Sequence, residues 1–179
     1  ISDIPFAPDN EIDNRNREIT NMRGFKIWME WRNRFDQPIL CNVAVISPKQ
    51  GSTVETLNFF RSSDQTRGTQ FDTGLQSMEF HYRGINTDQY NILTHRRFKL
   101  APLTQGTVFN SETPSYCMKK MYVPLKRQLR WDGPIQTQGR VFLVYWCDRM
   151  MEGVNSPVIA NHAEISHRVI AYFKEPKNS

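Results

Sequence analysis

Hydrophobic and polar residues alternate along residues 24–35, GFKIWMEWRNRF, with the two-residue period of a β-strand. One side of this segment is apolar throughout and carries Phe25, Ile27, Met29 and Trp31. The other side is mainly charged, with one tryptophan, and carries Lys26, Trp28, Glu30, Arg32 and Arg34. The pattern predicts a strand with one face in the core and one face toward solvent.

Further strands are predicted where short apolar or alternating runs are bounded by turn residues. They cover residues 37–47, 89–102, 118–131, 139–148 and 164–174. The first and fourth of these are apolar on both faces, as expected of central strands. The last places Ile165, His167, Val169, Ala171 and Phe173 on one side.

The remaining stretches predict one helix and long loops. Ser52 and Glu55 have the spacing of a helix N-terminal capping box, so a short helix is expected near 53–62. Residues 62–87 are polar and predict a long loop with at most one strand, at 77–83. These elements predict an all-β fold, a single jelly-roll antiparallel β-sandwich with one short helix and long loops. We expect an N-terminal extended arm (1–22) followed by one jelly-roll domain (23–179).

Composition excludes several classes of protein. Hydrophobic residues make up 39% of the 179 residues, which is too many for a disordered chain. No apolar run reaches the roughly 20 residues of a membrane-spanning helix, and no signal-peptide pattern is present. Cys41, Cys117 and Cys147 form no CxxC pair and are expected to be reduced, buried thiols. Because the sequence starts at Ile1 rather than Met, a further segment is expected upstream.

Positive charge is concentrated in one part of the chain. The formal net charge is +5, but residues 83–131 hold nine Lys and Arg against two acids, a net charge of +7. Residues 1–22 are instead acidic, with five acids against two arginines. A local excess of this size indicates an anionic partner for the basic third of the chain.

Two predicted strands carry this charge beside apolar residues. Alternation places His95, Arg97 and Lys99 on one face of 89–102, and Lys120, Tyr122 and Lys126 on one face of 118–131. If the strands are neighbours, the two faces form one basic patch for phosphates, with Tyr122 or Trp131 stacking on bases. The candidate nucleic-acid-binding residues are His95, Arg97, Lys99, Lys120, Tyr122, Lys126, Arg127, Arg130 and Trp131. The alternative is that these cations pair with acids of neighbouring subunits or rim the sheet.

Four segments carry a resemblance to a known family. They are YNILTHRRFKLAP (90–102), KKMYVPLKRQLRW (119–131), RVFLVYWCD (140–148) and RVIAYFKE (168–175). In this order they resemble the single jelly-roll coat proteins of small icosahedral viruses. The likeness is greatest to circular single-stranded DNA viruses of the circovirus, geminivirus and genomovirus kind, and to satellite plant-virus coats. It covers most of residues 24–175.

The resemblance implies a structural capsid protein of the virion. Such a subunit self-assembles into an icosahedral shell, the smallest (T=1) having about 60 identical copies. It packages a single-stranded genome, circular DNA by likeness or RNA as in satellite coats, and is assembled in the host nucleus or cytoplasm. A host receptor would be a further partner. The acidic residues 1–22 depart from the arginine-rich arm with which such coats usually begin.

Enzymatic interpretations find little support in the sequence. The four histidines, His81, His95, His162 and His167, lack the two-residue spacing of a cupin metal site. No nucleophile elbow, zinc-protease motif or phosphate-binding loop occurs. We therefore expect no catalysis, no metal and no cofactor.

A monomeric β-sandwich module that binds nucleic acid or carbohydrate is the remaining alternative. The two classes differ in their surfaces, because a coat subunit must leave apolar side chains for its neighbours. Trp28, Met150 and Met151 are candidates for such subunit contacts, and each could equally pack beneath a loop of its own chain.

Overall fold

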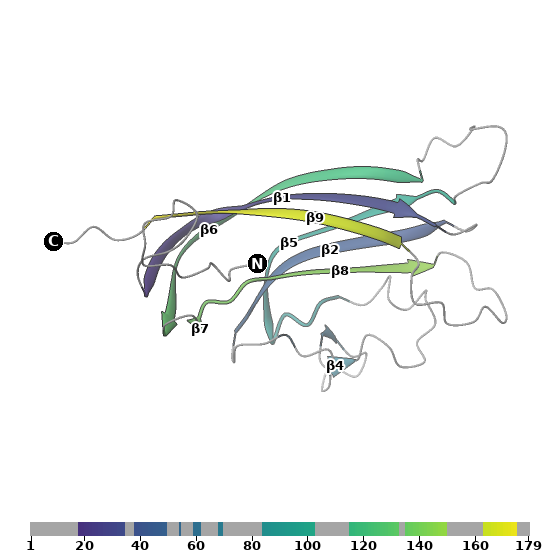
Figure 1. Cartoon of the computed structure of the whole chain (residues 1–179). Helices are drawn as coiled ribbons and strands as arrows, with labels where there is room; N and C mark the ends of the chain where they lie inside the picture. Colours follow the sequence, from purple (N-terminus) through teal and green to yellow (C-terminus); the bar gives the residue numbers. More distant parts are fainter. Residues whose placement is uncertain are drawn as a thin grey trace.

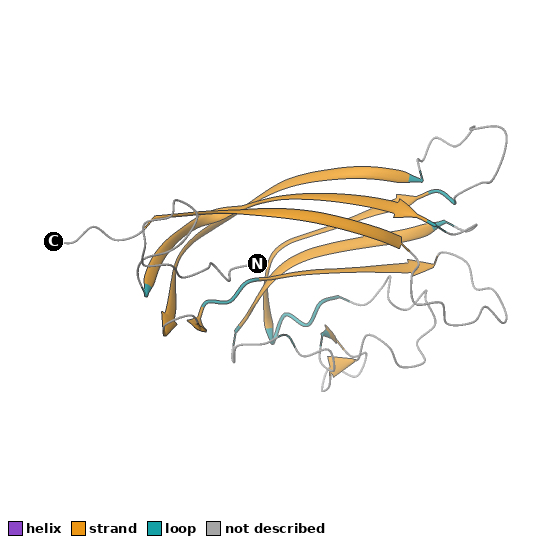
Figure 2. Cartoon of the chain, in the orientation of Figure 1, coloured by secondary structure: helices purple, strands orange, loops and turns teal. Residues whose placement is uncertain are grey.

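The computed structural model describes residues 18–34, 38–49, 54, 59–61, 68–69, 84–102, 115–132, 135–149 and 163–174. These residues form strands and contain no helix (Figure 2). The described strands are β1 (Ile19–Asn33), β2 (Ile39–Pro48), β3 (Phe60–Arg61), β4 (Gly68–Thr69), β5 (Tyr90–Leu100), β6 (Tyr116–Asp132), β7 (Ile135–Gln138), β8 (Phe142–Arg149) and β9 (Ala163–Lys174).

The long strands form two antiparallel sheets that lie one over the other (Figure 1). One sheet has the strand order β7–β6–β1–β9 and the other has the order β5–β2–β8. The consecutive pairs β1–β2, β5–β6 and β8–β9 each place one strand in either sheet. The all-β antiparallel sandwich that the sequence predicts is confirmed.

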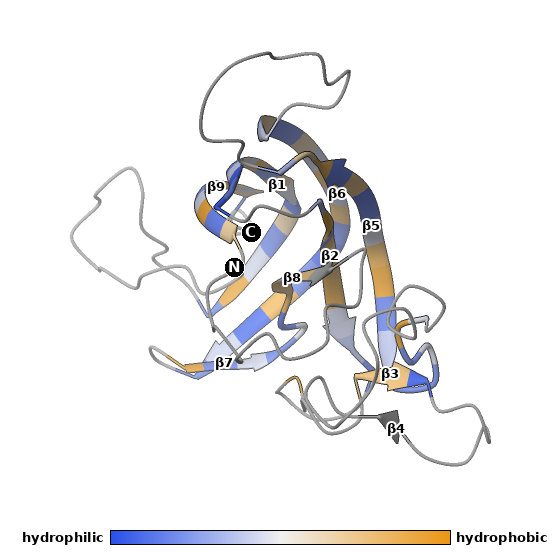
Figure 3. Cartoon of the chain, turned by 90° about the vertical axis from the view of Figure 1, so that its right-hand side faces the viewer, coloured by the Kyte–Doolittle hydropathy of each residue, from blue (hydrophilic) through white to orange (hydrophobic). Residues whose placement is uncertain are grey.

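The main core lies between the two sheets and is built from alternate residues of each long strand, an alternation visible in Figure 3. The predicted inward face of β1 is confirmed, since Phe25, Ile27, Met29 and Trp31 are fully buried. The Trp31 ring meets two rings of the opposite sheet edge-on, Phe98 at 5.2 Å and Tyr145 at 5.9 Å between centroids. Burial of these large side chains is the main force that holds the sheets together.

A second apolar cluster lies on the other face of the three-stranded sheet. Ala44 and Ile46 of β2 and Trp146 of β8 pack there against Phe59, Phe60, Ile85 and Tyr90. β2 is therefore buried on both faces, as its continuous apolar sequence predicts. Among the described residues, this sheet has a core on each side, whereas the four-stranded sheet packs against the main core alone.

The predicted helix near 53–62 is wrong at its C-terminal end, because Phe60 and Arg61 form strand β3. Phe60 is buried against Trp146, so tertiary packing favours an extended backbone over the local helical pattern. Residues 55–58 lie outside the described residues, as do 1–17 and 77–83. Strand β1 begins at Ile19, inside the segment that the sequence assigned to an arm.

The three cysteines are free thiols, but the expectation that all are buried holds only for Cys41, since Cys117 and Cys147 are half-buried. Cys41 and Cys147 lie opposite each other on β2 and β8, with their Sγ atoms 3.7 Å apart. The described part of the chain has no helix with the length and apolarity that crossing a membrane requires.

Candidate functional site

The outward face of the four-stranded sheet gathers cations and aromatic rings from three strands. Because the odd-numbered residues of β1 and β6 point into the core, the even-numbered residues between Gly24 and Arg32 and between Tyr116 and Arg130 point outward. β9 adds its own outward residues beside β1. We call this surface the cationic face and define it by Lys26, Trp28, Lys120, Tyr122, Lys126, Arg168 and Tyr172.

Strand register arranges the cationic face in rows across β6, β1 and β9. Lys120 and Arg168 are the direct neighbours of Trp28 on either side. The next row consists of Tyr122, Lys26 and Ile170, and the row after it of Pro124, Gly24 and Tyr172. Residues directly opposite each other on one face are close enough to bind one ligand together.

Trp28 lies at the centre of the first row, between two ammonium groups. The Nζ atom of Lys26 is 4.8 Å from the centroid of the Trp28 ring, and that of Lys120 is 6.0 Å away. These distances fall within the range of cation–π attraction, which orients the lysines around the indole. Trp28 is half-buried, so part of its ring remains exposed beside these positive charges.

Two tyrosines stand beside Trp28 on the same face. Tyr122 and Tyr172 are 55% and 41% exposed, and their ring centroids are 6.2 Å apart. Gly24 lies beneath them, where a Cβ atom would meet the Tyr122 hydroxyl oxygen at 2.7 Å and the Val123 carbonyl oxygen at 2.5 Å. The Tyr122 hydroxyl also donates a hydrogen bond to the Arg23 carbonyl oxygen at 3.3 Å. Glycine at this position is what lets Tyr122 lie across β1.

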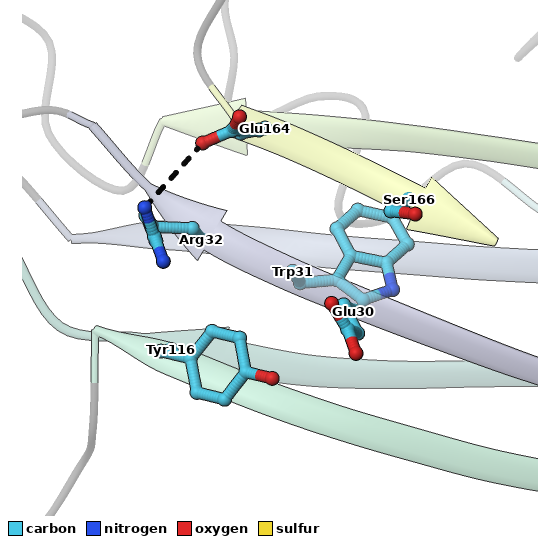
Figure 4. Close-up of a pocket in the computed structure, with 6 residues that line it drawn as sticks. All are labelled: Glu30, Trp31, Arg32, Tyr116, Glu164 and Ser166. Atoms are coloured by element: carbon cyan, nitrogen blue, oxygen red, sulfur yellow. Dashed lines mark ion pairs between the residues drawn. The ribbon is translucent and has the colours of Figure 1, made fainter.

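Positive and negative charges are balanced at one end of the face, whereas the other end is positive. At the Arg32 end of β1, Glu164 forms an ion pair with Arg32 at 3.8 Å, and Glu30 and Tyr116 line the same hollow (Figure 4). Glu164 also forms an ion pair with Arg34 at 2.7 Å. At the Arg23 end, Arg23, Lys126, Arg127 and Lys174 line a pocket whose described lining includes no acid. A bound polyanion is therefore attracted to the Arg23 end and to the middle rows.

The expected single basic patch is wrong, because β5 and β6 are not neighbours in one sheet. His95, Arg97 and Lys99 do share one face, as alternation predicts, but it is the outward face of the three-stranded sheet. Lys120, Tyr122 and Lys126 point outward from the other sheet. The two groups therefore lie on opposite sides of the sandwich.

The position of the His95 side chain is determined by packing against an aromatic ring. Its ring stacks on Trp146 at 5.4 Å, and its Nε2 atom lies 3.4 Å from the Asn42 side-chain oxygen. Burial lowers the pKa of His95 below its ordinary value, and the nearby Arg97 charge lowers that pKa further. A neutral, stacked imidazole is a weak phosphate ligand.

Three other predicted binding residues differ in their surroundings. Trp131 is 3% exposed and belongs to the main core, so its expected stacking on bases is wrong. Arg127 points inward from β6 and donates a hydrogen bond to the Ser47 hydroxyl at 3.0 Å, so it links the two sheets. Arg130 is exposed on the outward side of β6. Met150 and Met151 lie outside the residues that the structure describes.

Sequence reasoning assigned no binding role to Lys26, Arg168, Tyr172 or Lys174, which the structure brings to this face or its edge. Arg168, Tyr172 and Lys174 share the polar side of the last strand, a signal that was present in the alternation of 164–174. What the sequence lacked was the pairing of that strand with β1. Trp28, predicted as a subunit contact, lies among these cations.

Within the described ranges, no group of three or more His, Cys, Asp and Glu side chains could hold a metal ion. No protein-family model and no curated protein matches the chain.

Proposed function

We propose that this chain is a jelly-roll coat subunit that assembles into an icosahedral shell and binds a single-stranded genome on its cationic face. The observation that carries the proposal is that face itself, where Trp28 and two tyrosines lie among lysine and arginine side chains of three adjacent strands. Cations that contact phosphates and rings that stack on bases are the parts that sequence-tolerant single-strand binding requires.

Row spacing favours a single strand over a duplex. Successive rows lie two residues apart along β1, which is about 6.8 Å in an antiparallel sheet. Stacked bases of a duplex are separated by only about 3.4 Å along each strand. A chain that offers one base to each row must therefore have its bases separated, as a single strand can and a duplex cannot.

Two features support a shell-forming subunit. The strand pairs β1–β2, β5–β6 and β8–β9 each cross between the sheets, which is the winding expected of a jelly roll. Met118 and Ile135, at 60% and 62% exposed, present apolar side chains that an assembled neighbour would cover. The sequence resemblance to coats of circular single-stranded DNA viruses makes DNA the proposed cargo.

The experiment is electron microscopy and sedimentation of the purified protein, with the absorbance ratio at about 260 and 280 nm taken on any particle fraction. We expect uniform shells with a high ratio, and nuclease treatment of the extracted cargo identifies DNA or RNA. Replacing Lys120 and Arg168 by Gln should lower the nucleic acid per shell. The matched control replaces Lys49 and Arg96, two exposed cations outside the face, and should keep it.

Shells that form normally while both double variants carry equal cargo would contradict a role for the cationic face. A protein that stays monomeric, even with added single-stranded DNA, would contradict the coat function. If that monomer still binds the DNA through Trp28 and Lys120, the protein is a nucleic-acid-binding module.

A further inference from the structure

An irregularity in β1 lies beside a pocket at the Arg23 end of the cationic face, and this pocket shares Tyr122 and Lys126 with that face. The register of β1 shifts between Met22 and Gly24 in its pairing with both β6 and β9. Such a bulge re-aims the side chain that it carries, here Arg23. The pocket beside it has a volume of about 650 Å³. This volume lies within the range of small-ligand sites, roughly 300–1,000 Å³.

The lining of this pocket is strongly positive. Four cationic residues line it, and three of them, Arg23, Lys126 and Lys174, are exposed, whereas the guanidinium of Arg127 donates a hydrogen bond to Ser47. No described acid lines the pocket or forms an ion pair with any of the four. Cations brought together without a counter-charge repel one another, and a bound phosphate relieves that repulsion with charge-assisted hydrogen bonds.

The pocket is also held in shape by its neighbours. Arg127 is fixed by its hydrogen bond to Ser47, and the Arg23 backbone by the Tyr122 hydroxyl. The Tyr122 ring and Pro124 supply apolar lining beside the cations. A site with exposed cations beside an exposed aromatic ring is suited to a ligand with a phosphate and a flat base.

We propose that this pocket binds one nucleoside monophosphate unit, with its phosphate among Arg23, Lys126 and Lys174 and its base against Tyr122. The proposal deepens the function proposed above, because it gives the genome a discrete site at one end of the face. It is nevertheless separable from that function, since a free nucleotide can occupy the pocket without shell assembly.

The test is calorimetric titration of the purified protein, in its native assembly state, with deoxyadenosine monophosphate at about 50 mM salt. We expect saturable binding that is at least about tenfold weaker in the double variant Lys126→Gln, Lys174→Gln. Tyr122→Leu should weaken it about fivefold or more through loss of stacking. Tyr122→Phe keeps the ring but loses the hydrogen bond to the Arg23 carbonyl oxygen, so it should weaken binding less than Tyr122→Leu does. The control double variant Lys49→Gln, Arg96→Gln removes the same charge elsewhere and should also bind like wild type.

Inorganic phosphate and deoxyadenosine separate the two halves of the ligand. Each alone should bind more weakly than the nucleotide, and a short oligonucleotide should compete with it. Equal affinity for inorganic phosphate, together with no effect of Tyr122→Leu, would overturn the nucleotide assignment. Equal loss in the control and pocket variants would overturn it as well, because a general positive field would then explain binding. Absence of saturable nucleotide binding in the wild-type protein would also overturn the assignment.

Failure here is distinguishable from failure of the proposed function. Lys120→Gln with Arg168→Gln lies outside the pocket and should leave nucleotide affinity unchanged while lowering cargo. Lost cargo with intact nucleotide binding, or the reverse, therefore identifies which of the two sites operates. Thermal melting confirms that each variant is folded, as expected for exposed side chains such as Lys126 and Lys174.

Discussion

Trp28 on the inner strand β1 and Trp146 on the edge strand β8 both point outward from their sheets, yet their surroundings differ. Trp146 is 9% exposed and packs against Phe59, Phe60 and the His95 ring at 5.4–5.6 Å. Trp28 is flanked instead by the ammonium groups of Lys26 and Lys120. One tryptophan is part of a second core, and the other is part of a charged surface.

The residues beside each tryptophan on the outward face of its sheet determine whether its ring is buried or exposed. Around Trp146 the outward residues of β2 include Ala44 and Ile46, so apolar residues 59–60 and 85 can cover it without desolvating a charge. Covering Trp28 in the same way would remove Lys26 and Lys120 from water, which costs several kcal/mol per ion unless an anion accompanies them. The cationic face is therefore better suited to a polyanion than to an apolar cover.

Much of the fold follows from the sequence because alternation is a local signal. The inward faces of β1 and β6, the double burial of β2 and the paired faces of β5 all agree with the pattern of residues. The helix near 53–62 failed at Phe60 because the second core, a long-range feature, overrides the local capping signal.

The candidate site was harder to predict, because it depends on which strands pair. Lys120 and Tyr122 were identified from the charge beside them, but their partners on β1 and β9 are distant in sequence. The parity of alternation also places Trp131 inward with Leu129, although its expected role was stacking on bases. Sheet assignment, which separates Lys99 from Lys120, is not encoded in either strand alone.

The largest expected effect is a loss of stability when the packing around Trp146 is removed. Phe60→Ala removes a fully buried ring whose centroid is 5.5 Å from Trp146, so the free energy of unfolding should fall by about 3–5 kcal/mol. Trp28→Ala should lower it by less, because its ring is only half-buried. Urea denaturation of both variants measures the contrast. Equal losses would mean that the two faces do not differ in this way.

Gly24→Ala tests how tightly the exposed face is built. The added Cβ would approach the Val123 carbonyl oxygen at 2.5 Å, and backbone cannot move away cheaply. We expect a loss of about 1–3 kcal/mol in the free energy of unfolding. Combining it with Tyr122→Ala should restore only part of that loss, because the carbonyl contact remains. Wild-type stability in Gly24→Ala would contradict the close approach of β6 to β1.

Trp28→Ala and Lys120→Gln separate the contribution of stacking from that of charge in the binding of single-stranded DNA. Loss of one base–indole contact should weaken binding of a short DNA oligonucleotide by about 1–3 kcal/mol and leave the salt dependence unchanged. Lys120→Gln should instead reduce the slope of log affinity against log salt by about 0.7. Fluorescence anisotropy across a salt series measures both quantities. A changed slope in Trp28→Ala, or an unchanged one in Lys120→Gln, would reverse the assigned roles.

The smallest expected effect is a pH dependence that originates at the covered face. Because burial first and Arg97 second lower the pKa of His95 in the folded protein, the unfolded chain binds that proton more readily. The stabilisation is therefore present above the ordinary histidine pKa near 6.5 and is lost as pH falls through and below it. Between about pH 7.5 and about pH 5.5, His95→Gln should lose less stability than wild type, and Arg97→Gln should fall between them. Denaturation curves that decline equally in wild type and His95→Gln would show that the imidazole stacked on Trp146 does not carry this dependence. The pH dependence of stability in Trp28→Ala should match that of wild type, because His95 stacks on Trp146 and not on Trp28.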